Sequence, residues 1–332
     1  MAKTWPSVGQ ALDQTLDKGP GGTMPELILH HFDPSPFAEK IRLVFGLKGL
    51  AWQSVDIPMV PPKPDLTALT GGYRRTPVLQ VGADIYCDTR LIALELERRF
   101  PTPTLFPGAT RGLALALASW ADRSFFDPGA ALAMGTNLGL LPEPLLADRK
   151  AFFNFMDFSR LGEDVPHMYT QLRSQLDTLE QALAAGTDFL GGSAPGWADI
   201  GAYFPVWMVR GNLANAADVL APFPLVRAFA DRMLALGQGR RSELAATDAL
   251  AVARAATALP GAGVTLRDEV ATALNLQAGD TVQVTPDDYG KTPVTGTLYS
   301  YTLHEVAVQR IDERAGTVVV HFPRAQYRVE RA

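Results

Sequence analysis

The chain has 332 residues, of which 47% are hydrophobic and 20% charged, the composition of a globular protein with two or three domains. Its net charge of −5 argues against binding to nucleic acid or to an anionic membrane surface. No stretch of about 18 apolar residues suggests a membrane span, and the first 24 residues lack the pattern of a secretory signal. The single cysteine, Cys87, rules out an internal disulfide bond and fits a reducing compartment.

Residues 1–24 end in a glycine-rich run and are expected to form a loosely attached N-terminal extension. The next segment, 25–106, predicts a small mixed sheet with helices packed on it. Two short apolar runs flank Gly82-Ala83-Asp84, the pattern of a β-hairpin. The predicted elements are, in order, strand 27–32, a helix that starts at Pro36, strand 52–57, a loop at 58–64, strands 77–81 and 85–87, and helix 89–100.

The segment 109–245 predicts an all-α helical bundle domain, because no strand-like alternation interrupts its helical periodicity. Gly196 can serve as the N-cap of one of these helices, and the Asp199 carboxylate can then accept a hydrogen bond from the Gly196 amide. The expected helices are 110–126, 144–160, 165–185, 198–210 and 223–237.

The last segment, 260–332, changes to short alternating strands and predicts a small β-barrel-like domain that begins with a helix at 266–275. It carries seven basic and nine acidic residues, a balance that disfavours a nucleic-acid-binding barrel. We expect it to pack against the helical domain or against a partner copy. The predicted strands are 281–284, 296–299, 306–309 and 318–322.

Ser35-Pro36-Phe37 opens the first predicted helix. Serine is a favoured N-cap and proline a favoured first helical residue, so the motif can be purely structural. A hydroxyl at this position can also donate a hydrogen bond to a bound thiolate, in a place where the helix dipole adds about half a positive charge. The motif by itself leaves both interpretations open.

Thr76-Pro77-Val78 opens a predicted strand. Proline is tolerated at the first residue of a strand, and a trans bond before it is the common case. A cis bond would turn the backbone so that the N–H and C=O of Val78 could pair with a peptide-like ligand.

Asp88-Thr89 opens the next predicted helix, and a helix cap is again a sufficient explanation. Alternatively, the backbone amides and the Thr89 hydroxyl hold a carboxylate while Asp88 holds an amine. An α-amino acid end carries both groups. Together the three motifs describe a pocket for a small, thiol-bearing, peptide-like anion.

In this order the three motifs resemble the thioredoxin-like domain of cytosolic glutathione transferases. S-P-F-x-x-K-I-R at 35–42 resembles the serine-type, tau-like and omega-like classes, and R-R-T-P-V-L at 74–79 resembles the cis-proline strand of the family. D-T at 88–89 stands where the family usually has Glu-Ser or Asp-Ser. The resemblance covers about residues 25–240 and implies an α+β multidomain protein: a thioredoxin-like βαβ-ββα glutathione-binding domain, 25–106, an α-helical domain, 109–245, and an additional small β domain, 260–332.

The resemblance also implies a role for each matched residue. Ser35 would stabilise the thiolate of glutathione, and Val78 would pair with its cysteinyl backbone. Asp88 and Thr89 would hold the γ-glutamyl end, and Lys63 would contact the glycyl carboxylate. Omega-like members have cysteine where this chain has Ser35, which argues for thiolate activation and against a mixed-disulfide mechanism. Further candidates for glutathione binding are Phe37, Arg75, Thr76 and Pro77.

The second substrate would bind in a cleft between this domain and the first helices of the bundle. Trp120, Phe125 and Phe126 are the candidate lining residues, although such an aromatic stripe on a helix more often belongs to the core. The run 130–165 is a candidate lid. The resemblance implies no metal.

The leading hypothesis is an enzyme, a glutathione transferase, that takes glutathione as substrate and conjugates it to a small hydrophobic electrophile. Two alternatives stay open: a non-catalytic binding or assembly module that kept the fold, and a glutathione-dependent isomerase or lyase. The resemblance implies a cytoplasmic homodimer with a role in detoxification. No nucleic-acid or membrane partner is expected.

Overall fold

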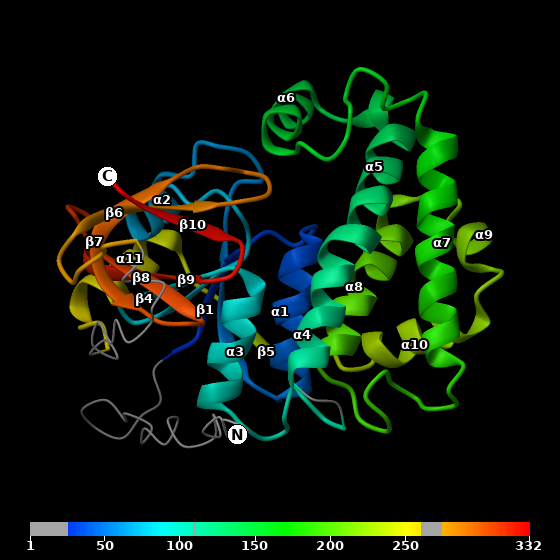
Figure 1. Cartoon of the computed structure of the whole chain (residues 1–332), viewed down its shortest axis with the longest axis horizontal. Helices are drawn as coiled ribbons and strands as arrows, with labels where there is room; N and C mark the ends of the chain where they lie inside the picture. The colour runs from blue at the N-terminus through cyan, green and yellow to red at the C-terminus, as the bar shows by residue number, and fades with distance from the viewer. Residues whose placement is uncertain (1–25, 109–110, 260–273) are drawn as a thin grey trace, which may run out of the picture.

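The computed structural model describes residues 26–108, 111–259 and 274–332. The expected N-terminal extension, 1–24, and nearly all of the helix predicted at 266–275 lie outside these residues. Figure 1 shows the helices of residues 111–234 gathered on one side and the C-terminal strands on the other, with most of the N-terminal elements between them. None of the helices in the described part of the chain is long and apolar enough to cross a membrane.

The N-terminal α/β domain, residues 26–108, has the order of strands and helices predicted for a thioredoxin-like domain. It also contains a helix, α2, where the sequence predicted only a loop and unassigned residues. Seven residues that begin with a proline show too little periodicity to reveal a helix. The elements are β1 (Ile28–His31), α1 (Pro36–Leu47), β2 (Ala51–Asp56), α2 (Pro64–Thr70), β3 (Val78–Val81), β4 (Asp84–Cys87) and α3 (Thr89–Arg99).

The helical domain, residues 111–234, confirms the predicted bundle with different helix boundaries. The helix expected to end at 126 continues to Thr136 through a π-helical segment, and the helix expected to reach 160 ends at Phe152. The elements are α4 (Arg111–Trp120), the π-helical segment (Ala121–Phe125), α5 (Phe126–Thr136), a 3-10 turn (Leu138–Leu140), α6 (Glu143–Phe152), α7 (Val165–Leu183), α8 (Trp197–Asn212), α9 (Ala216–Leu220) and α10 (Pro224–Leu234).

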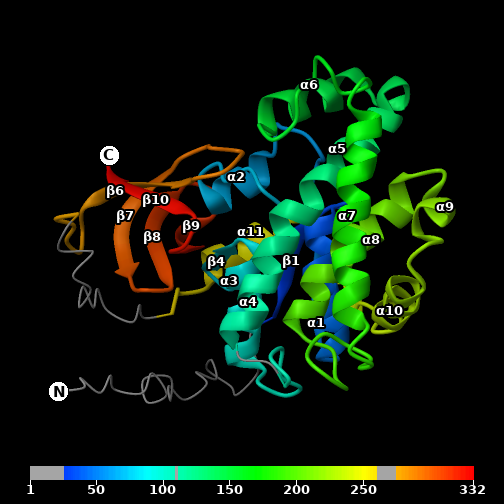
Figure 2. The ribbon, with the colours of Figure 1, turned by 45° about the vertical axis from the view of Figure 1, so that its right-hand side comes forward.

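Helix α8 occupies the centre of this domain and contacts α1, α4, α5 and α10 (Figure 2). Its start carries the predicted cap: the Asp199 carboxylate accepts from the Gly196 amide at 2.9 Å and from the Leu190 amide at 2.7 Å. Gly201 lies against α4, where a Cβ would come 2.9 Å from the Ala118 Cα. This close approach sets the position of α4, which carries part of the pocket described below.

The chain after α10 returns to the sheet. Three elements here were not predicted, namely β5, α11 and β10. Strand β5 is short, polar and exposed. We call the strands β6–β10 the C-terminal β region. The elements are β5 (Arg240–Glu243), α11 (Ala246–Ala255), β6 (Thr281–Pro286), β7 (Val294–Tyr301), β8 (Glu305–Asp312), β9 (Gly316–Pro323) and β10 (Tyr327–Arg331).

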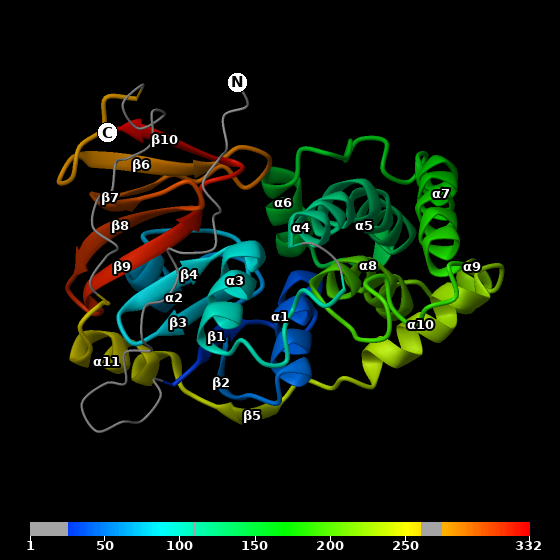
Figure 3. The same ribbon diagram turned by 60° about the horizontal axis from the view of Figure 1, so that its bottom comes forward.

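All ten strands form one sheet with the order β10-β6-β7-β8-β9-β4-β3-β1-β2-β5. The C-terminal β region is attached because β9 pairs in parallel with β4, with Ile85 opposite Val320 (Figure 3). At the other end, β5 pairs in parallel with β2. An uncovered edge strand leaves a row of free backbone donors and acceptors, so both additions satisfy edges of the N-terminal sheet.

Two apolar layers flank the N-terminal strands, which explains why every residue of β1 and β3 is buried. Leu29 and Leu79 pack in one cluster with α1, α3 and the helical domain. Ile28 and Val78 point the other way, into a cluster with α2, α11 and the inner face of the C-terminal β region. The C-terminal β region therefore shares a hydrophobic core with the N-terminal α/β domain.

Candidate active site

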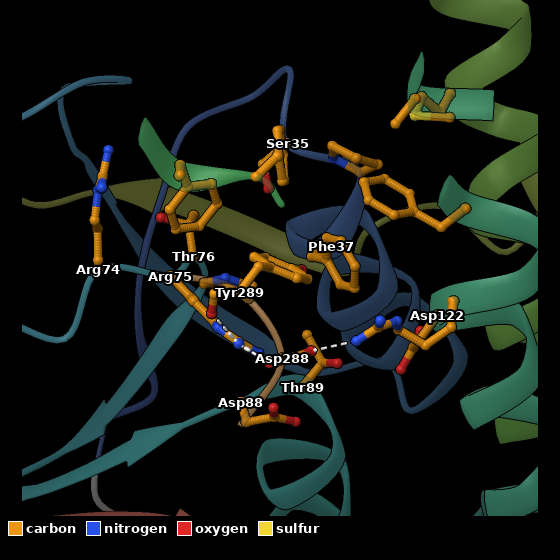
Figure 4. A pocket seen from close by; sticks show the side chains of 18 of the residues that line it. Ser35, Phe37, Arg74, Arg75, Thr76, Asp88, Thr89, Asp122, Asp288 and Tyr289 are labelled. Atoms are coloured by element: carbon orange, nitrogen blue, oxygen red, sulfur yellow. Dashed lines mark hydrogen bonds and ion pairs between the residues drawn. The ribbon is translucent and has the colours of Figure 1, made fainter. Parts of the chain in front are cut away.

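A cavity of about 270 Å³ opens where the three parts of the chain meet. Helix starts and loops of the N-terminal α/β domain, helices α4, α5, α6 and α8, and two loops of the C-terminal β region form its wall. Figure 4 shows one residue of each sequence motif, Ser35, Thr76 and Asp88, around the same space as Asp288 of the C-terminal β region. The fold thus brings the three motifs to one pocket.

Ser35 caps α1 and lies on the pocket wall. Its side-chain oxygen accepts from the Ala38 amide at 3.2 Å, and Pro36 is the first helical residue. The cap uses a lone pair of the oxygen, so the hydroxyl proton stays available. This proton has no acceptor among the described residues. One hydroxyl can therefore cap the helix and donate to a ligand at the positive end of the helix dipole.

The Thr76–Pro77 peptide bond is cis, and both residues line the pocket. The structure places Val78 elsewhere: its side chain is fully buried, and its strand β3 is paired with β1 on one side and β4 on the other. In the described part of the chain, the buried Thr76 hydroxyl has no hydrogen-bond partner. The same holds for Arg75 Nε and Trp197 Nε1, which also belong to lining residues. Buried polar atoms without partners are rare, and a ligand would satisfy them.

Asp88 and Thr89 open α3 on the wall of the pocket. Asp88 Oδ1 accepts from the Arg90 amide at 2.9 Å and so caps the helix, while Oδ2 accepts from the Tyr327 hydroxyl at 3.1 Å. The backbone of Asp88 has a φ of 76°, a value that few non-glycine residues adopt. Thr89 presents its hydroxyl and amide at the positive end of α3, which suits a carboxylate.

Asp288, in the loop between β6 and β7, is a pocket residue that the sequence did not reveal. Its carboxylate accepts from Arg75 and, at 3.1 Å, from Arg123. Arg75 also donates to the Tyr289 carbonyl, and its guanidinium lies 4.3 Å from the centroid of the Tyr289 ring. Burial opposes ionisation of Asp288, but the adjacent Arg75 holds the pKa of this carboxyl below its ordinary value. Arg75 is thus partnered by an internal carboxylate.

Positive charge accumulates on the side of the pocket nearest α6. Asp148 accepts from Arg74 and, at 2.5 Å, from Arg149. Lys63 lines the same wall and has no ion-pair partner among the residues described. Burial, followed by the charge of Arg149, lowers the pKa of Lys63 to about 8. Three cations around one carboxylate leave an excess of positive charge that suits an anionic group.

The side of the pocket formed by the helical domain is largely apolar. Phe37 and Phe126 line it, and their ring centroids are 4.8 Å apart in an edge-to-face arrangement. Trp120 and Phe125 are not on the wall: Trp120 donates to Gln175 at 2.9 Å, and Phe125 is fully buried in the core. The π-helical segment changes the 3.6-residue spacing between these aromatic residues, so helical periodicity alone could not separate lining from core.

Helix α6 contributes Asp148, Arg149 and Phe152 to the wall, although none of its residues is buried. Contacts with the loop between β6 and β7 hold its C-terminal end. The Gly290 amide donates to the Phe152 carbonyl at 3.1 Å, and the rings of Phe152 and Tyr289 pack with centroids 5.2 Å apart. Part of the run considered as a lid, 130–165, thus borders the pocket and is attached to the C-terminal β region.

Three further residues with acid–base or nucleophilic side chains, His30, His31 and Cys87, lie away from the pocket. His30 and His31 are buried in β1, where their side chains contact Gln80 and Ser54, and burial lowers the pKa of each to about 4. Cys87 is fully buried, which raises its pKa. Within 26–108, 111–259 and 274–332, no group of three or more His, Cys, Asp and Glu side chains is arranged to hold a metal ion.

Comparisons with known proteins place both the domains and the C-terminal β region in context. Residues 29–104 match the family model described as glutathione S-transferase, N-terminal domain, and residues 145–232 match that of the C-terminal domain. The crystal structure of a GST-like protein from Pseudomonas syringae matches with a TM-score of 0.75 and 38% identity, and covers 93% of this chain and 100% of that chain. No curated protein matches the chain.

A tau class glutathione S-transferase from mango, Mangifera indica, matches with a TM-score of 0.50 and 17% identity, over 63% of this chain and 89% of that chain. The alignment with the Pseudomonas syringae protein covers 93% of this chain, so the few unaligned residues cannot include the whole C-terminal β region. The alignment with the mango protein, in contrast, leaves more than a third of this chain unaligned. At least part of the C-terminal β region is thus shared with a GST-like protein.

Proposed function

Because the chain belongs to the glutathione S-transferase family, we propose that it binds glutathione in the pocket described above and activates the thiol for attack on a small hydrophobic electrophile. The observation that carries this proposal is the convergence of Ser35, Asp88 and Thr89 on one cavity. Ser35 opens α1, and Asp88 and Thr89 open α3, so the positive ends of two helices face the same space. Such a site favours a ligand with several negative or partly negative groups.

Glutathione offers a matching group for each part of the wall. Its γ-glutamyl carboxylate suits the amide and hydroxyl of Thr89, and its α-ammonium suits the Asp88 carboxylate. The glycyl carboxylate would lie toward Lys63, on the cation-rich side. The cysteinyl backbone would pass Thr76, whose hydroxyl lacks a partner. In this arrangement Thr76 takes the backbone contact that the sequence assigned to Val78.

Activation requires the thiol of glutathione to ionise near pH 7. A free thiol has a pKa of about 8.5, and lowering it by about two units needs roughly 2.7 kcal/mol of selective stabilisation of the thiolate. A charge-assisted hydrogen bond contributes about 1.5–3 kcal/mol, and a helix N-terminus adds about 0.3–1 kcal/mol. The Ser35 hydroxyl and the start of α1 can therefore supply the required stabilisation together. The thiolate then forms a bond to the electrophile, which gives up its leaving group or accepts the electron pair.

The apolar side of the pocket is the proposed site for the electrophile. Phe37 comes from α1, Phe126 from α5 and Met208 from α8, so this side is shared between the two domains. An apolar second substrate bound there would lie beside the thiolate at the start of α1. We also propose that α6, which borders the cation-rich side, closes the pocket during turnover.

The test compares Ser35→Ala with Ser35→Thr in an assay of chlorodinitrobenzene conjugation, with glutathione affinity measured by calorimetry. We expect Ser35→Ala to lower kcat about 100-fold through loss of the thiolate hydrogen bond, whereas Ser35→Thr keeps most of the activity because it keeps a hydroxyl. Ser119→Ala, on the α4 side of the same pocket, is the matched control and should behave as wild type. Full activity of Ser35→Ala would sink the assignment.

Two finer expectations belong to the same proposal. Members of the family frequently form dimers, and we propose a homodimer, which sedimentation velocity would distinguish from a monomer. We propose that the protein acts in the cytoplasm in detoxification.

A panel of electrophiles and isomerisable substrates, each assayed with glutathione, would separate conjugation from isomerase or lyase chemistry. A protein that binds glutathione and turns over none of them would be a binding module.

A further inference from the structure

The C-terminal β region contributes directly to the pocket through two loops. Asp288 and Tyr289 come from the loop between β6 and β7, and Gln326 from the turn between β9 and β10. The two loops are joined, since the Asp287 amide donates to the Gln326 carbonyl at 2.9 Å. Gln326 and Asp88 both have positive φ and both line the pocket, although they come from different parts of the chain. Unusual backbone conformations of this kind concentrate at functional sites.

Immediately after Gln326, the Tyr327 side chain reaches the residue that the proposed function uses to hold an amine. The Tyr327 hydroxyl donates to Asp88 Oδ2 at 3.1 Å, and the hydroxyls of Tyr327 and Tyr73 are 2.8 Å apart. A phenol has one proton to donate. Since Tyr327 gives its proton to Asp88, Tyr73 must donate to Tyr327, so the hydrogen bonds run in one direction, from Tyr73 through Tyr327 to Asp88.

The surroundings of Tyr327 keep this chain of hydrogen bonds in place. The Tyr327 side chain is buried, and its ring packs against Phe322 with centroids 5.7 Å apart. Burial, and then the negative charge of Asp88, raise the pKa of Tyr327 well above its ordinary value, so the hydroxyl remains a donor across the physiological range. With Oδ1 bound to the Arg90 amide and Oδ2 to Tyr327, both oxygens of Asp88 are held in a fixed orientation.

We propose that Tyr327 is a positioning residue for ligand binding: its hydroxyl fixes the Asp88 carboxylate so that the remaining lone pairs face the α-ammonium of the γ-glutamyl end. This inference rests on the proposed function and assigns to the C-terminal β region a part in selecting ligands with an α-amino group. A carboxylate that is already oriented loses less conformational freedom when the ammonium binds. Tyr327 does not itself line the pocket and acts only through Asp88.

The test measures the binding of two ligands by calorimetry: glutathione, and an analogue in which hydrogen replaces the α-amino group. Tyr327→Phe keeps the buried ring and removes the hydroxyl. We expect it to weaken glutathione about tenfold and the analogue by less than twofold, because only glutathione carries the ammonium that Asp88 binds. In turnover, KM for glutathione should rise by a similar factor while kcat stays unchanged.

Tyr299→Phe is the matched control. Tyr299 lies on β7 of the same β region and does not line the pocket. The substitution removes a hydroxyl that donates to the Leu259 carbonyl at 2.8 Å. The affinities for both ligands should therefore match those of wild type. Tyr73→Phe removes the far end of the hydrogen-bond chain and should show the same ligand selectivity with a smaller, about threefold, loss.

The outcomes separate this inference from the proposed function. Wild type that binds neither ligand would overturn the proposed function and the inference with it. Wild type that binds glutathione, together with Tyr327→Phe that binds it equally well, would overturn the inference alone. Equal weakening of both ligands by Tyr327→Phe would also overturn it, since a purely structural effect does not distinguish the two ligands.

Discussion

The pocket has two walls whose polar groups are held in different ways. On the wall of the N-terminal α/β domain, Ser35 and Asp88 are fixed by caps to amides two or three residues away. On the wall of the C-terminal β region, Asp288 is fixed by Arg75 of the N-terminal α/β domain, and behind this wall the buried Tyr327 is fixed by Asp88 of the same domain. The first wall is built by local structure and the second by long-range contacts. The two walls should therefore respond differently to substitution.

The largest expected effect is at the junction between the N-terminal sheet and the C-terminal β region, where β9 pairs with β4. His321 on β9 contacts Asp84 on β4 through Nε2 and Glu305 on β8 through Nδ1, each at 2.9 Å. Removing the imidazolium with His321→Gln leaves two carboxylates without a cation, and breaking such a buried pair typically costs about 3–5 kcal/mol. Urea unfolding at pH 6 should show this loss. Unchanged stability would mean that the pairing of β9 with β4 does not depend on the charge.

The same junction predicts a pH dependence. Burial would lower the pKa of His321, but Glu305 and Asp84 outweigh it and raise the pKa to about 10. The stabilisation is then fully present below about pH 6.5, where the unfolded histidine is also protonated, and is lost as the pH rises through about 10. The difference in stability between wild type and His321→Gln should therefore shrink from pH 6 to pH 10, which unfolding curves across this range would show.

The second largest effect is the loss of stability expected when the Asp288 carboxylate is removed, with the adjacent Asp287 as control. Asp288→Asn removes the partner of Arg75 and Arg123, and we expect it to lower the free energy of unfolding by about 2 kcal/mol, because two partly buried cations lose their counter-charge. Asp287→Asn is the matched control: the residue is exposed and its side chain has no ion pair in the described part of the chain. Thermal melts that show equal losses for the two variants would contradict a specific role of Asp288.

On the other wall, Asp88→Asn separates capping from binding. Asparagine caps a helix about as well as aspartate, so the stability should change by less than about 0.5 kcal/mol. The loss of charge should nevertheless weaken glutathione about 20-fold, because the α-ammonium loses its ionised partner. Calorimetry measures the affinity, and a melting curve of the same sample checks the fold. A parallel loss of stability and affinity would indicate that Asp88 acts only as a cap.

The smallest effect concerns Lys63, whose pKa is lowered to about 8. In the proposed binding mode, protonated Lys63 attracts the glycyl carboxylate and neutral Lys63 does not, so affinity should fall as the pH rises above about 8. S-methylglutathione avoids ionisation of the ligand thiol in this titration. We expect Lys63→Met to bind it about fivefold more weakly at pH 7 and with a flatter pH profile. An unchanged profile would remove Lys63 from the site.

The contrast between the walls also explains which parts of the structure could be predicted. The three motifs and the N-cap at Gly196 are local signals, because a cap, a proline and the residues they serve lie within four positions in the chain. The missed strands depend on distant partners: β5 is a strand only because it pairs with β2, and β10 pairs with β6. Trp120 and Phe125 could not be told from Phe126 because the π-helical segment between them changes the spacing.

The amino-acid sequence alone predicts the order of domains, the helix starts that carry Ser35, Asp88 and Thr89, and the resemblance that connects them to one ligand. The tertiary structure was needed to show that the C-terminal strands join the N-terminal sheet through β4, so that Asp288 reaches the pocket and Tyr327 reaches Asp88. The physical reason is the range of the interactions. Caps and turns are set by neighbouring residues, whereas an edge strand accepts any compatible partner, and the choice depends on which distant side chains pack beside it.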